Sequence, residues 1–144
     1  MNKNTQTFAK IAMIAAIYTV VSLVLAPFTY GNIQVRIAEA LTLLPLIYKP
    51  SIAGVTLGCF LTNLIGAMIG VNPTGMIDSV VGTTATLLAA LLTYYLRNRK
   101  LAGIPVWSIL MPVVFNFFFV GMELSVLFFD GNVWLGLLIM GTEV

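Results

Sequence analysis

Histidine is absent from this chain of 144 residues, and cysteine occurs once, at Cys59. Without histidine the chain has no side chain whose unperturbed pKa lies near neutrality, and an ordinary His/Cys transition-metal site is disfavoured. A single cysteine excludes a disulfide within the chain. Cys59 lies inside an apolar run, so we predict a small packing residue rather than a nucleophile. We therefore predict neither a metal nor a cofactor.

Charge is also scarce. Only 8% of the residues are charged and 60% are hydrophobic, with a mean hydropathy of +1.03. Soluble domains are about one quarter charged, so we predict an integral membrane protein whose solvent is the lipid bilayer. The few basic residues stand at the ends of apolar runs rather than in one patch, which argues against a nucleic-acid partner. An enzyme is the least favoured class, because the serines have no plausible base within the membrane.

Breakers and charges divide the chain into about six apolar segments, each close to or somewhat below the roughly 20 residues that a spanning helix needs. The segments are residues 7–26, 35–48, 51–70, 75–96, 105–128 and 133 onward. We predict an all-α membrane protein of about six transmembrane helices, forming a single integral membrane domain over residues 1–144. The last segment reaches about 18 Å as a helix, so we expect it to be incomplete or unusually short.

The basic residues predict the orientation of the chain. With the N-terminus in the cytoplasm, only Arg36 falls outside, and all other basic residues fall on the cytoplasmic side: Lys3, Lys10, Lys49, Arg97, Arg99 and Lys100. Because cytoplasmic loops are enriched in Lys and Arg, we predict a cytoplasmic N-terminus.

Small residues recur at four-residue spacing in the third segment, at Gly54, Gly58, Thr62, Gly66 and Gly70. This spacing predicts a helix face that another helix of the same chain approaches closely. The first segment carries a second, weaker pair of this kind, Ala12 and Ala16.

Polar residues interrupt the apolar segments. The second segment opens with Gln34, Arg36 and Glu39, and in a helix Arg36 and Glu39 share a face, where they can pair or reach one polar pocket. An Arg–Glu pair that only ends a helix at the headgroup level is the alternative. The preceding loop, residues 27–33, contains the turn-like Tyr30-Gly31-Asn32 and is a candidate lid.

Placed by depth in the predicted topology, these polar residues converge on the extracellular half, with Glu143 deeper on the last segment. The predicted site comprises Gln34, Arg36, Glu39, Asn63, Asp78, Asn116, Glu123 and Glu143. The predicted site has several carboxylates but only one cation, Arg36, so at least one carboxylate lacks an internal partner. This favours a ligand with an ammonium group or an N–H edge that such a carboxylate can accept. The amides suit the edge of a heterocycle. We favour Glu123 and Glu143 over Asp78, which can instead stabilise a helix N-terminus.

The stretch at residues 32–45, Asn-Ile-Gln-Val-Arg-Ile-Ala-Glu-Ala-Leu-Thr-Leu-Leu-Pro, resembles the hallmark of the QueT family. These proteins are the substrate-binding S components of energy-coupling factor (ECF) transporters for queuosine precursors. The late Gly141-Thr-Glu143 resembles the Gly-x-Glu of that family's last helix. The resemblance implies a six-helix protein of the bacterial plasma membrane that binds 7-cyano- or 7-aminomethyl-7-deazaguanine.

The resemblance also implies partners, namely a membrane coupling subunit and two cytoplasmic ATPases. Ala12 and Ala16 match the Ala-x-x-x-Ala pair by which S components dock the coupling subunit. The sequence contains no Walker-type phosphate loop, which agrees with ATP hydrolysis by separate subunits.

Other interpretations stay open at this point. One is an S component for another vitamin, such as thiamine. Another is a small proton-coupled exporter in which a membrane carboxylate alternates between a proton and a cation. A third is a structural membrane subunit without a ligand.

Overall fold

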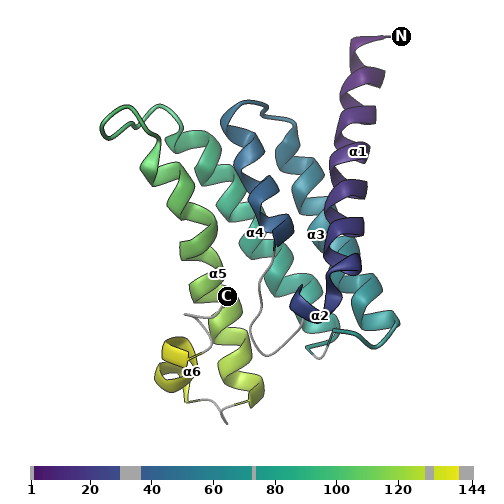
Figure 1. The fold of residues 1–144 in the computed structure, drawn as a ribbon, viewed down its shortest axis with the longest axis vertical. Coiled ribbons are helices and arrows are strands. Elements are labelled where there is room, and N and C mark those ends of the chain that lie inside the picture. The colour runs from purple at the N-terminus through teal and green to yellow at the C-terminus, as the bar shows by residue number, and fades with distance from the viewer. Residues whose placement is uncertain (1, 30–36, 73, 129–131, 140–144) are drawn as a thin grey trace.

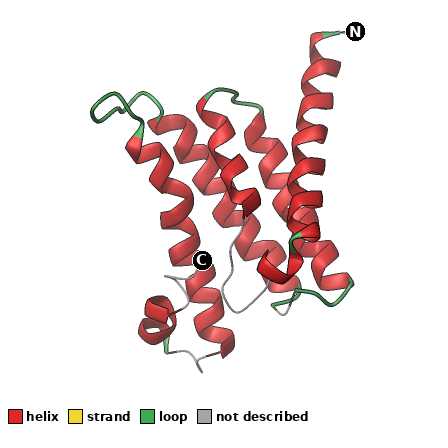
Figure 2. Cartoon of the chain, in the orientation of Figure 1, coloured by secondary structure: helices red, strands yellow, loops and turns green. Residues whose placement is uncertain are grey.

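The computed structural model describes residues 2–29, 37–72, 74–128 and 132–139. The described residues are helical except for turns and one isolated bridge between Leu101 and Ile104 (Figure 2). The elements in chain order are α1 (Lys3–Val24), α2 (Ala26–Thr29), η1 (Ile37–Leu46), α3 (Ser51–Met68), α4 (Met76–Leu96), α5 (Val106–Phe128) and α6 (Val133–Ile139).

Within the described part of the chain, four helices, α1, α3, α4 and α5, are long and apolar enough to cross a membrane. The N-terminus, the turn between η1 and α3, and the loop between α4 and α5 all lie at one end of the bundle (Figure 1). This end carries the basic residues outside the second segment, and we call it the cationic end. The all-helical membrane fold is thus confirmed.

The predicted number of six spanning helices is not confirmed. The sequence predicts a short second helix over residues 35–48, but the structure has a 3₁₀-helix, η1, of 10 residues. A 3₁₀-helix rises about 2.0 Å per residue, so η1 is about 20 Å long and falls short of a hydrocarbon core of about 30 Å. It begins near mid-height of the bundle and runs to the cationic end (Figure 1). Helix α6 is described only over its 7 residues.

Helices α1 and α3 pack against each other at glycines. A Cβ atom added at Gly54 would lie 2.9 Å from Ile14 Cβ, and one at Gly58 would lie 2.7 Å from Tyr18 Cβ. The Thr19 hydroxyl also donates to the Gly58 carbonyl at 3.2 Å. The predicted close approach of another helix to the glycine face is therefore confirmed, and its partner is α1.

A hydrogen bond from α4 replaces the helical bond that a proline inside α5 removes. Pro112 has no N–H group, so the Ser108 carbonyl four residues earlier loses its usual helical donor. The Thr93 hydroxyl of α4 donates to this carbonyl at 3.1 Å. Because an unpaired carbonyl is costly in a membrane, this bond fixes α5 against α4 next to Pro112.

Candidate ligand-binding site

Glu39 lies in the first turn of η1 and is 8% exposed. The Tyr18 hydroxyl of α1 donates to Glu39 Oε1 at 3.1 Å, and the Thr86 hydroxyl of α4 lies 3.4 Å from the same oxygen. Side chains from two spanning helices therefore orient the carboxylate of a third element. A carboxylate held in this way inside a bundle is expensive to bury, which favours a functional role.

The hydrogen bonds continue from Thr86 into α3. Thr86 Oγ1 lies 3.3 Å from the sulfur of Cys59, and Asn63 Nδ2 lies 3.6 Å from the same sulfur. A hydroxyl has one proton, so Thr86 donates to Glu39 or to Cys59 but not to both at once. Cys59 is a buried free thiol in this cluster, in agreement with the packing role predicted for it.

Asp78 and Asn63 hold the turn between α3 and α4. The Asn63 side-chain amide donates to the Asp78 backbone carbonyl at 3.0 Å. The Asp78 carboxylate accepts a bond from Asn72 Nδ2 at 3.2 Å, and Asn72 in turn accepts two bonds from Thr74. Asp78 lies in the first turn of α4, where a negative charge is favourable. These contacts support the structural alternative for Asp78.

Glu39 and Asn116 line the same cavity of about 330 Å³ between η1 and α5. Asn116 is 6% exposed, and its Oδ1 atom has no hydrogen-bond partner among the residues that the structure describes. The remaining lining residues are Ala40, Leu43, Ile109, Pro112 and Val113. An oriented carboxylate and an available amide oxygen thus face an otherwise apolar space, and we call it the Glu39 cavity.

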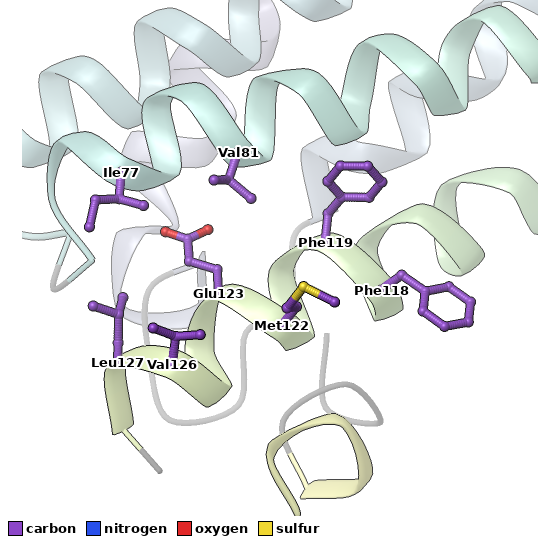
Figure 3. A pocket seen from close by; sticks show the side chains of 8 residues that line it. All are labelled: Ile77, Val81, Phe118, Phe119, Met122, Glu123, Val126 and Leu127. Carbon is purple, nitrogen blue, oxygen red and sulfur yellow. The ribbon is translucent and has the colours of Figure 1, made fainter. Parts of the chain in front are cut away.

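Glu123 lines a different cavity of about 400 Å³ between α4 and α5, which we call the Glu123 cavity. Its carboxylate is directed toward Ile77 and Val81 of α4 (Figure 3). The other side chains that line this cavity are all hydrophobic. Asn116 and Glu123 were predicted to share a face of α5. Both are buried, but seven residues are about 10 Å of helix, and they line separate cavities.

The remaining predicted residues do not line either of these cavities in the described structure. Gln34, Arg36, Glu143 and the Tyr30-Gly31-Asn32 loop lie outside the described residues. Ala12 and Ala16 are exposed on α1. Among the described residues, no group of three or more His, Cys, Asp or Glu side chains is arranged to hold a metal ion.

Sequence reasoning missed Tyr18 and Thr86. Both lie in apolar helices, where one hydroxyl among hydrophobic residues gives no sign of a hydrogen-bond partner on another helix. The signal that was available is Gly58: a glycine in a packing face leaves room for a large side chain opposite, and Tyr18 occupies that position.

These features define the class of multi-pass helical membrane proteins that bury polar side chains between their helices. Membrane transport proteins bury polar side chains in this way. The family model described as "QueT transporter" matches residues 8–143. The chain belongs to this family, which is a family of transporters rather than enzymes.

Among curated proteins, the chain is similar to the queuosine precursor transporter QueT of Lactococcus lactis subsp. cremoris (strain MG1363). The two are 30% identical over 97 residues, which is 66% of this chain and 53% of the relative. The matched part thus spans about half of the relative's length. No solved structure matches the chain significantly.

Proposed function

We propose that this chain is the substrate-binding S component of an ECF transporter and binds a queuosine precursor, 7-cyano- or 7-aminomethyl-7-deazaguanine. In this proposal it lies in the bacterial plasma membrane with the cationic end in the cytoplasm. The name of the Lactococcus relative supports the ligand class. The observation that carries the proposal is the Glu39 cavity, which a buried carboxylate and a buried amide line together.

The chemistry of a 7-deazaguanine fits this pair of residues. The ring presents an N1–H and an adjacent amino group, and a carboxylate accepts such a donor pair through both oxygens. In this proposal Asn116 Oδ1 accepts a further N–H of the ligand, and its amide nitrogen donates to a ring carbonyl. A volume of about 330 Å³ also lies in the range of small-molecule sites, roughly 300–1,000 Å³.

Other predicted residues have supporting roles in the proposal. Gln34 and Arg36 precede Glu39 by a few positions, and we assign them to the ring carbonyl. Glu123 and Glu143 are the candidates for the cation of an aminomethyl group. Asn63 and Asp78 belong to the polar cluster beside the site, where their contacts hold α3 to α4.

The test is a titration of the full-length protein in detergent with 7-aminomethyl-7-deazaguanine, with 7-cyano-7-deazaguanine, guanine and thiamine as competitors. We expect tight binding that both deazaguanines compete for and thiamine does not. Asn116→Leu is expected to weaken binding, and Thr84→Val, whose exposed hydroxyl donates to the Val80 carbonyl of the same helix, is the matched control. Displacement by thiamine alone would refute the proposed ligand and leave a vitamin S component as the better interpretation.

The proposed docking surface for the coupling subunit is the exposed face of α1. Within the membrane-spanning window of α1, 22% of the residues are buried, compared with 44% for α3. Ala12 and Ala16 lie on the exposed part and are small enough for a partner helix to approach closely. Copurification with the coupling subunit and the two ATPases tests this. Ala12→Trp and Ala16→Trp are expected to abolish it, whereas Ile17→Trp, also exposed but about 140° around the helix from Ala12 and about 100° from Ala16, is expected to preserve it.

A further inference from the structure

A groove of about 690 Å³ runs along the outside of α3, between α1 and α4. Its walls include Ile11, Ala53, Leu57, Phe60 and Leu87, and among the described residues that line it Lys49 alone is charged. Leu57 and Phe60 are 44% and 39% exposed, so the groove opens to the membrane rather than into the bundle. From Lys49 to Phe60 the lining covers roughly 16 Å of helix, which is about one leaflet of a 30 Å hydrocarbon core.

Two cations contact one aromatic ring, and one of them, Lys49, lines the groove. Lys49 Nζ lies 5.3 Å from the centroid of the Tyr94 ring, and Arg97 Cζ lies 3.8 Å from the same centroid. Arg97 Nη1 also donates to the Tyr94 backbone carbonyl at 2.9 Å. The two distances place the charges no more than about 9 Å apart, and their contacts with Tyr94 restrict both side chains, which lowers the entropy cost of binding one anion between them.

The chain places no acidic residue in the sequence segments around these cations. Its five acidic residues are Glu39, Asp78, Glu123, Asp130 and Glu143, and none lies in residues 1–20, 45–60 or 90–105. The cationic end therefore attracts an anion from outside the chain, and the groove beneath it is suited to a hydrocarbon chain.

We propose that Lys49 and Arg97 bind the headgroup phosphate of an anionic phospholipid, one acyl chain of which lies in the groove along α3. The phosphate accepts hydrogen bonds from both side chains, and the apolar walls cover the chain that continues from it. This site is separate from the Glu39 cavity and does not depend on the identity of the transported ligand.

The experiment is native mass spectrometry of the full-length protein released from mixed micelles that contain equal amounts of phosphatidylglycerol and phosphatidylcholine. We expect one phosphatidylglycerol to be retained in preference to phosphatidylcholine. In the double variant Lys49→Gln/Arg97→Gln, retention is expected to fall roughly 30-fold, since each basic residue near a membrane surface contributes about 1 kcal/mol. Ala53→Phe, which fills the groove without changing charge, is expected to reduce retention as well.

The matched control is Arg99→Gln/Lys100→Gln, which removes the same charge from the same end at exposed positions that do not line the groove. Equal losses in the two double variants would mean diffuse attraction and overturn the proposal. Full retention in Ala53→Phe would likewise overturn the assignment of the acyl chain. Displacement of the lipid by soluble glycerol phosphate would reduce the site to a phosphate site and also contradict it.

One further outcome concerns a protein occupant. If no lipid is retained and the coupling subunit alone protects Leu57→Cys from a thiol reagent, the groove belongs to that partner and the lipid proposal fails. Unfolded variants are recognised by loss of the monodisperse peak in size-exclusion chromatography. Lys49→Arg provides a second check on folding, since it keeps the charge and is expected to retain the lipid.

Discussion

Glu39 and Glu123 are both buried carboxylates, 8% and 7% exposed, but their surroundings differ. Glu39 accepts a hydrogen bond from Tyr18, has Thr86 beside it, and shares its cavity with Asn116. Glu123 shares its cavity with hydrophobic side chains, several of which are exposed at the surface of the bundle. Burial alone therefore does not distinguish a ligand site. The second polar group distinguishes the two, because Asn116 lines the cavity of Glu39, whereas the described residues that line the cavity of Glu123 with it are hydrophobic.

The largest expected difference between the two carboxylates is in ligand affinity. Glu39→Gln removes the charged acceptor from the proposed site, and we expect binding of 7-aminomethyl-7-deazaguanine to weaken by roughly 2–5 kcal/mol. Glu123→Gln is expected to cost less than about 1 kcal/mol with 7-cyano-7-deazaguanine, which has no cation for Glu123 to contact. Titration of both variants with both deazaguanines measures this. A larger loss in Glu123→Gln for the cyano compound would move the site to the Glu123 cavity.

Packing between α1 and α3 positions Tyr18 beside Glu39, whereas the Glu123 cavity lies between α4 and α5. Gly58→Leu places side-chain atoms where Tyr18 now lies, and such overpacking costs about 1–3 kcal/mol. We expect a lower unfolding temperature in detergent and weaker ligand binding, because Tyr18 must move away from Glu39. Ala9→Leu on the exposed part of α1 is the control. Unchanged stability in Gly58→Leu would contradict the close contact between the helices.

Tyr18→Phe tests the orientation of the carboxylate alone. The ring and its packing stay, while the hydroxyl bond of 3.1 Å to Glu39 is lost. We expect ligand affinity to fall by about 1 kcal/mol, as for a single hydrogen bond. Tyr95→Phe, at an exposed tyrosine, is expected to bind normally. Equal affinity in the two variants would show that Tyr18 does not orient Glu39.

The smallest effect is expected from Thr93→Val, which leaves the Ser108 carbonyl beside Pro112 without its donor from α4. Hydrogen bonds between membrane helices average about 0.6 kcal/mol. The loss is expected in thermal stability and slightly in ligand affinity, because Pro112 lines the Glu39 cavity. Thr84→Val serves again as the control, and a loss of the same size there would remove any special role for the Pro112 region.

Much of the fold follows from the sequence because a bilayer permits few solutions. Apolar runs bounded by Pro, Gly and charge became α3, α4 and α5, with ends within a few residues of the predicted ones. The spacing of Gly54 and Gly58 likewise predicted a close helix contact. The 3₁₀ geometry of η1 was not predictable, since hydrophobic periodicity does not distinguish helix types over 10 residues.

The candidate site was predictable only as a set of residue types. Periodicity places Asn116 and Glu123 on one face of a helix but does not show which cavity each one lines. It also does not show which helices are neighbours, so the bonds of Tyr18 and Thr86 to Glu39 could not be foreseen. The assignments of Gln34, Arg36 and Glu143 stay predictions.

The glycine contact between α1 and α3 has a mechanical consequence. At Gly54 and Gly58 the side chains of Ile14 and Tyr18 lie directly against the backbone of α3, where a side chain on α3 would not fit. We expect such closely packed helices to move together, which carries the Tyr18 hydroxyl with the pair. If the Glu39 cavity is the transport site, its opening is then expected to come from displacement of η1 or α5 relative to this pair, and movement of η1 would separate Glu39 from Tyr18.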